Sequence, residues 1–239
     1  LTYLTTPITQ ERKTMQKTIH KNNENQGLLQ PIHKKTVSSD TFTQSFDVIR
    51  VYLTEDGIGG VSEHLDQIEA INSATENDIV EVYCIGCPGG SADTIIAILN
   101  ALSNTPAHTA TILEGHNASA ASMPMMVTDE VHIGRYSSVM FHNVAGGVGG
   151  NITNTAEAAK FYEQHYNKFF AELYTKFLDE KELELIQNGR EIYLDFEQIQ
   201  ERLESRKKYF QQIDEEQDEE AAVKPKKSKK GNGNGETTT

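Results

Sequence analysis

Long apolar runs are absent from this sequence. No stretch of its 239 residues approaches the about eighteen consecutive apolar residues that a membrane-spanning helix needs. The opening LTYLTTPITQERK also lacks the basic-then-apolar order of a signal peptide. We therefore expect a soluble, cytoplasmic protein that has no membrane partner.

Basic residues are few. Lys and Arg number 22 against 35 Asp and Glu, so the formal net charge is −13. Nucleic acid backbones and anionic membranes attract the opposite sign, which argues against a general nucleic acid binder and favours protein or peptide partners. A G-x-x-x-x-G-K-[ST] loop is missing as well, so any ATP-driven step must come from a partner. We predict no cofactor.

Cysteine is scarce. Cys84 and Cys87 are the only two, and their C-x-x-C spacing is that of a redox pair or of half a zinc site. A structural zinc site needs two further Cys or His ligands at short spacing. A thioredoxin-like motif opens a helix, whereas Pro88-Gly89-Gly90 follows here. We interpret the pair as buried thiols at the end of a strand, and we predict no metal site.

The length favours one domain with additional segments at its ends. Residues 1–44 are rich in Thr, Gln, Asn and Lys and are predicted to form a flexible polar arm. Residues 45–210 carry the periodic segments and are predicted to form the domain. Residues 211–239 contain DEEQDEE, KPKKSKK and GNGNGETTT, and are predicted to be a disordered, charged tail.

Strands and helices alternate within this domain. The pattern predicts strands at 46–53, 78–86 and 108–114 and in EVHIG and SSVMFHN, and helices at 62–71, at 91–102 after Ser91, and in SAASMPMM. Such alternation indicates βαβ units. We predict the α/β class, with a mostly parallel sheet.

A long helix is predicted at 154–178, and Asn154 with Glu157 resembles a capping box at its start. An apolar and aromatic stripe runs along it, formed by Tyr162, Tyr166, Phe169, Leu173 and Phe177. The stripe fits packing against the sheet and fits packing against another subunit equally well.

Three segments carry candidate chemistry: CPGGS (87–91), GHNAS (115–119) and VMFHN (139–143). Each follows or ends a predicted strand, and ligands bind at the carboxyl ends of parallel strands, so the three are expected to meet. Acyl transfer needs a hydroxyl nucleophile, a base and oxyanion donors. Ser119 and Ser122 compete for the first role, and His142 is the candidate base.

These segments resemble the proteolytic subunit of the Clp protease (ClpP), a serine peptidase of the wider crotonase-like fold. That family places P-G-G, G-x-x-x-S and V-M-x-H in this order, and here they stand as PGG, GHNAS and VMFH. Gly90 precedes Ser119 by 29 residues and His142 follows Ser119 by 23, close to the family's intervals. The resemblance spans about residues 46–200. It implies a mostly parallel sheet built from ββα-type repeats, and a long handle helix.

The resemblance also implies roles for single residues. Ser119 matches the nucleophile and His142 the general base, while the N–H groups of Gly90 and Ala120 match the oxyanion hole. Glu191 stands 49 residues after His142, at the position of the orienting acid, where the family generally has Asp. Asp195 is the runner-up for that role, and Ser122 matches a small packing residue. Substrate binding falls on Gly89 and on Gly146 and Gly147 of the glycine-rich stretch 145–150, where an extended peptide pairs as an added strand.

The implied function is a serine endopeptidase that cleaves extended or unfolded polypeptides through an acyl-enzyme, inside a homo-oligomeric chamber of stacked rings. Its partners would be an ATP-dependent unfoldase or, in a divergent member encoded by a bacteriophage, phage capsid proteins during head maturation. The family's closing E-A-x-x-x-G-L is replaced by DFEQIQERLESRKKYF, so the last part of the core is expected to pack differently. Two alternatives remain: a catalytically inactive ring subunit with an assembly role, and a crotonase-type thioester enzyme.

Overall fold

The computed structural model describes residues 5–7, 33–39, 42–147 and 149–223. Within these residues the strands form a six-stranded sheet, in the order β1-β7-β5-β4-β3-β2, and a three-stranded sheet, in the order β6-β8-β9. The first sheet consists of β1 (Thr5–Pro7), β2 (His33–Ser39), β3 (Phe42–Leu53), β4 (Ile79–Ile85), β5 (His108–Glu114) and β7 (Glu130–Ile133). The second consists of β6 (His116–Ala118), β8 (Ser138–Phe141) and β9 (Ile192–Leu194).

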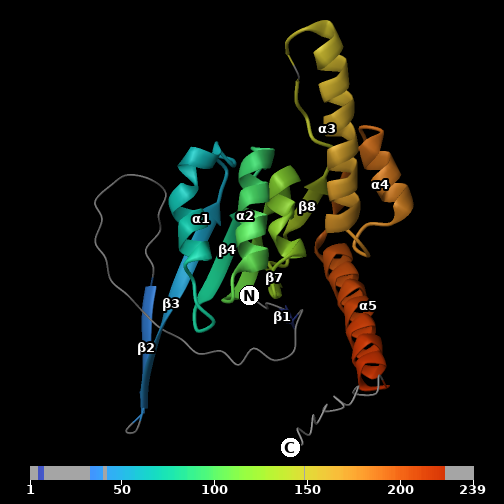
Figure 1. The fold of residues 1–239 in the computed structure, drawn as a ribbon. Coiled ribbons are helices and arrows are strands. Elements are labelled where there is room, and N and C mark those ends of the chain that lie inside the picture. The colour runs from blue at the N-terminus through green and yellow to red at the C-terminus, as the bar shows by residue number, and fades with distance from the viewer. Residues whose placement is uncertain (1–4, 8–32, 40–41, 148, 224–239) are drawn as a thin grey trace, which may run out of the picture.

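The centre of the large sheet is parallel. Strands β3, β4, β5 and β7 run in one direction, and β1 and β2 pair antiparallel at its two edges. Helices α1 (Leu65–Asn72) and α2 (Ala92–Asn104) connect the parallel strands and lie side by side on one face of the sheet (Figure 1). The predicted α/β class with a mostly parallel sheet is confirmed.

The core lies between this face and the helices. Alternate residues of β4 point inward, so Val80, Val82 and Cys84 are fully buried. The apolar residues of α2 recur at helical spacing and meet them, with Ile95 and Ile98 also fully buried. Full burial of one such side chain contributes about 1.5–3 kcal/mol to the stability of the fold. Ser91 caps α2 as expected, since its hydroxyl accepts a hydrogen bond from the Thr94 N–H at 3.3 Å.

Regular elements also occur in parts of the chain that were predicted to be the arm and the tail. Residues 33–39, expected in the arm, form β2, which pairs with the first half of β3 in a ribbon. Thr36, Val37 and Thr43 favour this outcome because β-branched residues suit strands. Residues 5–7 form β1, and the other residues of the predicted arm lie outside the described ones.

At the other end, α5 (Phe196–Val223) continues past residue 210, because Gln, Glu and Ala of the predicted tail are good helix formers. Residues 224–239 lie outside the described residues. No helix in the described part of the chain is long and apolar enough to cross a membrane.

Two local predictions also differ from the structure, and some elements were not predicted. SAASMPMM forms two short 3₁₀ turns, Ser119–Ser122 and Pro124–Met126, because Pro124 has no N–H to continue a helix. Helix α3 spans Ile152–Leu173, so Asn154 lies inside the helix and not at its cap. Strand β6 and helix α4 (Glu180–Gln187) are elements that the sequence analysis did not predict.

The aromatic stripe of α3 divides into two halves. Toward the C-terminal end Phe170 is buried, and just beyond the helix Tyr174 and Phe177 surround Phe141 of β8, with ring centroids 5.1 and 5.8 Å from it. Near the middle of the helix, Phe161 and Tyr162 are 62% and 49% exposed. The N-terminal part of α3 rises beyond the body of the molecule (Figure 1). The C-terminal part of the stripe is therefore core, and the rest is partly exposed.

Helix α5 is held to the body by two arginines. Arg202 forms a two-pronged ion pair with Glu182 of α4, at 2.7 and 2.8 Å. Arg206 donates to the carbonyls of Met126, Leu173 and Thr175, at 2.9, 3.4 and 3.0 Å. These contacts close the last part of the core, in which the sequence departs most from the resembled family.

Candidate active site

The three segments with candidate chemistry meet in one pocket. Its volume is about 370 Å³, and it is lined by Pro88, Gly90, Ser91, Ala92, Ser119, Ala120, Met123, His142, Val144, Ala145 and Phe170. The structure therefore brings together the predicted nucleophile, base and oxyanion donors. His142 follows directly on the buried Phe141, whose packing fixes the place of the histidine.

Ser119 has an unusual backbone. Its φ is +56°, in the left-handed region that residues other than glycine seldom adopt. Such strain persists only where neighbouring contacts hold it, and it is typical of functional turns. A serine on a sharp turn after a strand presents its hydroxyl to the pocket, the geometry of a nucleophile elbow.

Asn117 supplies the contacts that hold this turn. Its side chain is fully buried, accepts a hydrogen bond from the Cys87 N–H at 3.0 Å and donates to the Glu114 carbonyl at 3.1 Å. The Ala118 N–H donates to the Cys87 carbonyl at 2.8 Å. The asparagine therefore clamps the serine turn to the glycine loop, a role that the sequence analysis missed because it considered only the serines and the histidine.

The glycines of the P-G-G loop are required sterically. A Cβ on Gly89 would lie 2.7 Å from both the Ala118 carbonyl oxygen and the Ser119 Cβ. A Cβ on Gly90 would lie 2.2 Å from the Ile58 carbonyl oxygen. Within the described residues, the N–H groups of Gly90 and Ala120 donate no hydrogen bond, so both are free to bind an oxyanion.

Ser122 lies below the pocket. It is fully buried, and its hydroxyl donates to the Ser119 carbonyl at 2.7 Å. It also contacts the Tyr174 hydroxyl, whose pKa burial raises strongly. Ser122 therefore packs and supports the turn, in agreement with the role expected for it.

The pairing of β8 with β9 bears on which carboxylate lies near His142. The last paired residues are Phe141 and Ile192, and the next residue along the chain from each at this end is His142 on one side and Glu191 on the other. Asp195 lies four residues further along, and its carboxylate accepts from the Gln198 N–H at 2.9 Å as the cap of α5.

The carboxylate of Glu191 has a partner of its own. It accepts a hydrogen bond from the Tyr193 hydroxyl at 2.5 Å, and this bond is the main reason why the pKa of Tyr193 is raised. Tyr193 also stacks on His116, which hydrogen-bonds Ser138 at 2.9 Å. In the described part of the chain, no hydrogen bond or ion pair joins His142 to Ser119, Glu191 or Asp195.

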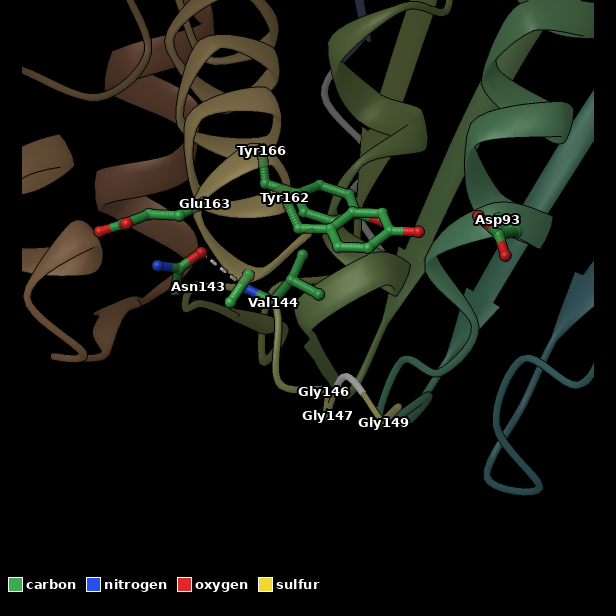
Figure 2. Close-up of a pocket in the computed structure, with 10 residues that line it drawn as sticks. Asp93, Asn143, Val144, Gly146, Gly147, Gly149, Tyr162, Glu163 and Tyr166 are labelled. Atoms are coloured by element: carbon green, nitrogen blue, oxygen red, sulfur yellow. Dashed lines mark hydrogen bonds between the residues drawn. The ribbon is translucent and has the colours of Figure 1, made fainter. Parts of the chain in front are cut away.

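A second pocket, of about 480 Å³, is drawn in Figure 2. Gly146 and Gly147 line it, together with Val144, which lines both pockets. The residues around these glycines form no strand in the single chain, and a Cβ on either glycine would meet nothing within 4 Å. The backbone expected to pair with a substrate therefore lies exposed along the route from one pocket to the other.

The two cysteines lie next to the pocket without lining it. Cys84 and Cys87 are free and fully buried, as interpreted from the sequence. Burial raises the pKa of both thiols, which disfavours the reactive thiolate. Within the described residues, no group of three or more His, Cys, Asp or Glu side chains is arranged to hold a metal ion.

Comparison with known families shows which family the chain resembles. Residues 34–200 match the family model described as Clp protease, which covers more than half of the chain. The match begins within β2 and includes β3 to β9 and both candidate pockets. No curated protein matches the chain.

Proposed function

Because the chain belongs to the Clp protease family, whose members are peptidases, we propose that it is a serine endopeptidase that cleaves extended polypeptides through an acyl-enzyme. The observation that carries this proposal is the strained turn at Ser119, which opens into a pocket shared with His142. A structural serine has no need of a left-handed backbone held by a buried asparagine.

The proposed reaction has two halves. The Ser119 hydroxyl attacks the scissile carbonyl while its proton passes to the imidazole of His142. The N–H groups of Gly90 and Ala120 stabilise the oxyanion, and collapse of the intermediate transfers the proton to the leaving amine. Water then attacks the acyl-enzyme with His142 as base again, which releases the second product and restores the serine.

Glu191 is the proposed third member of the site. It directly precedes Ile192, the strand partner of Phe141, whereas the carboxylate of Asp195 accepts a hydrogen bond at the cap of α5. A carboxylate at this place orients the imidazole and stabilises the imidazolium. In the single chain Glu191 is bonded to Tyr193, so activity requires a shift of its carboxylate toward His142.

Gly89, Gly146 and Gly147 are the proposed substrate-binding glycines. An extended peptide adds as a strand along exposed backbone, with main-chain hydrogen bonds that do not depend on its sequence. The exposed Ile152 and Phe161 of α3 support assembly of copies into a chamber, which fits the ring architecture typical of the family. Either an unfoldase or a set of capsid proteins would then present the substrate.

A second candidate is an inactive ring subunit. It is favoured by one observation, namely that His142 has no hydrogen-bond partner among the described residues. The peptidase and the inactive ring subunit are distinguished by incubating the full chain with a fluorogenic peptide mixture and with an unfolded protein. Cleavage that is lost in Ser119→Ala and kept in Ser122→Ala supports the peptidase, whereas absence of cleavage by the assembled native protein supports the ring subunit.

A further inference from the structure

The pocket beyond Val144 has a composition unlike that of the catalytic pocket. Its walls come from the start of α2, from the segment after β8 and from α3 (Figure 2). The lining residues are Asp93, Asn143, Val144, Gly146, Gly147, Gly149, Ala159, Tyr162, Glu163 and Tyr166. Two tyrosines and two acidic residues therefore line a space of about 480 Å³, large enough for a long side chain.

This pocket continues the catalytic one. Ala92 and His142 line the catalytic pocket, and their chain neighbours Asp93 and Asn143 line the second. On α3, Phe170 lines the catalytic pocket, and Tyr166, one helical turn before it, lines the second pocket. A peptide with its scissile carbonyl at Ser119 that follows the backbone after His142 places one of its side chains in the second pocket.

The charge of the pocket is negative. No Lys or Arg is among its lining residues, and neither Asp93 nor Glu163 forms an ion pair or hydrogen bond within the described residues. The pKa of Tyr166 is raised mainly by burial, and the negative charge of Asp93 raises it further. The Asp93 carboxylate on α2 therefore interacts electrostatically with a tyrosine on α3.

Figure 2 shows that the two carboxylates are not equivalent. Asp93 lies on the α2 side of the pocket, across from the rings of Tyr162 and Tyr166, while Glu163 points away from these rings at the rim. A cation between α2 and α3 therefore meets Asp93, and Glu163 contributes only to the general negative field.

We propose that this pocket is a substrate subsite for a lysine or arginine side chain, with Asp93 as its specificity-determining residue. The proposal rests on the function proposed above. The ammonium or guanidinium group binds the Asp93 carboxylate, and the aliphatic stem lies against Tyr162 and Tyr166, whose ring faces attract cations. An acidic side chain is repelled from the same place.

The test uses the full chain and matched peptides that differ at one position, with Lys, norleucine or Glu there. A peptide library whose cut sites are mapped by mass spectrometry first locates the position. Norleucine keeps most of the stem of Lys and removes the charge. We expect kcat/KM to fall in the order Lys, norleucine, Glu, and the preference for Lys over norleucine to shrink as salt is raised.

Asp93→Asn is the decisive variant, and Asp66→Asn on α1, an exposed carboxylate remote from the pocket, is its control with the same change of net charge. Asp93→Asn should lower kcat/KM for the Lys peptide about tenfold, as expected for one charge pair in a partly hydrated site, and leave the norleucine peptide unchanged. Glu163→Gln should have a smaller effect, and Asp66→Asn none.

The outcomes separate the two proposals. Cleavage that depends on Ser119 but shows no preference for Lys, or a preference that survives Asp93→Asn, overturns the subsite and leaves the peptidase intact. Absence of cleavage of every peptide, together with absence of serine labelling by a fluorophosphonate, overturns the proposed function and the subsite with it.

Discussion

The choice between Glu191 and Asp195 as partner of His142 gives the sharpest mutational prediction. Glu191→Gln keeps the shape of the side chain and removes its charge. Glu191 directly precedes Ile192, which pairs with Phe141, and Asp195 lies four residues on, which is about 13 Å along a strand at about 3.3 Å per residue. We therefore predict that Glu191, and not Asp195, reaches the imidazole.

The magnitude follows from the exposure of Glu191. Two unit charges about 4 Å apart interact by about 1 kcal/mol in bulk water and about 4 kcal/mol at the effective dielectric constant near a protein surface. Glu191 is exposed in the single chain, so its support of the imidazolium falls in this range. This corresponds to a loss of about fivefold to about a thousandfold in kcat, below the about ten-thousand-fold loss for the buried aspartate of the classical serine-protease triad.

The assay compares kcat of full-length wild type, Glu191→Gln and Asp195→Asn on one fluorogenic peptide, with the oligomeric mass measured by light scattering for each. Asp195→Asn should keep kcat and stability, because Asn caps a helix about as well as Asp. A large loss in Asp195→Asn with none in Glu191→Gln would refute the reasoning. Two harmless substitutions would leave a dyad of Ser119 and His142.

Three further predictions concern the framework of the site. Gly89→Ala should abolish cleavage and lower the free energy of unfolding by about 1–3 kcal/mol, because the new Cβ overpacks against Ser119. Gly86→Ala is the control: Gly86 also has a positive φ, but its Cβ would meet nothing within 4 Å, so activity should be kept. Peptide assays and thermal melts check both variants. Arg206→Met should cost about 2–3 kcal/mol in urea unfolding, since three carbonyls lose their donor, and the exposed Lys208→Met should cost almost nothing. The hydrogen bond from Arg202 lowers the pKa of Glu182, so the stability from this pair is complete above about pH 4.3 and is lost as the pH falls through the lowered pKa. Unfolding free energies between pH 5 and pH 3 should therefore fall more steeply for wild type than for Glu182→Gln, and equal slopes would mean that the pair does not act in this way.

Much of the fold was predictable because burial imposes periodic patterns on strands and helices. Strand β5 has the predicted bounds, and α2 begins after Ser91 as expected. Strand β6 was missed because three residues are too few for a periodic signal, and α4 because its charged residues hide the few apolar ones. Strand β2 and the end of α5 were not predicted, because composition carries no information on strand pairing or on how far a helix continues.

The site was predictable where chain order alone positions residues. Parallel strands end at one edge, so their loops meet, and Ser119 and His142 do line one pocket. What the sequence could not reveal depends on side-chain geometry: the left-handed Ser119, the clamp by Asn117 and the bond that ties Glu191 to Tyr193. The pocket around Asp93 was missed for the same reason, because α2 and α3 are far apart in sequence.

The most direct measurement of the central claim is the site of covalent labelling by a fluorophosphonate. The full native chain is incubated with the probe, digested and analysed by mass spectrometry, with Ser119→Ala and Ser122→Ala treated in parallel. The account predicts one adduct on Ser119, lost in Ser119→Ala and retained in Ser122→Ala, because Ser119 combines the strained turn with a place in the same pocket as His142. An adduct on another serine, or no adduct on an assembled native protein, would contradict it.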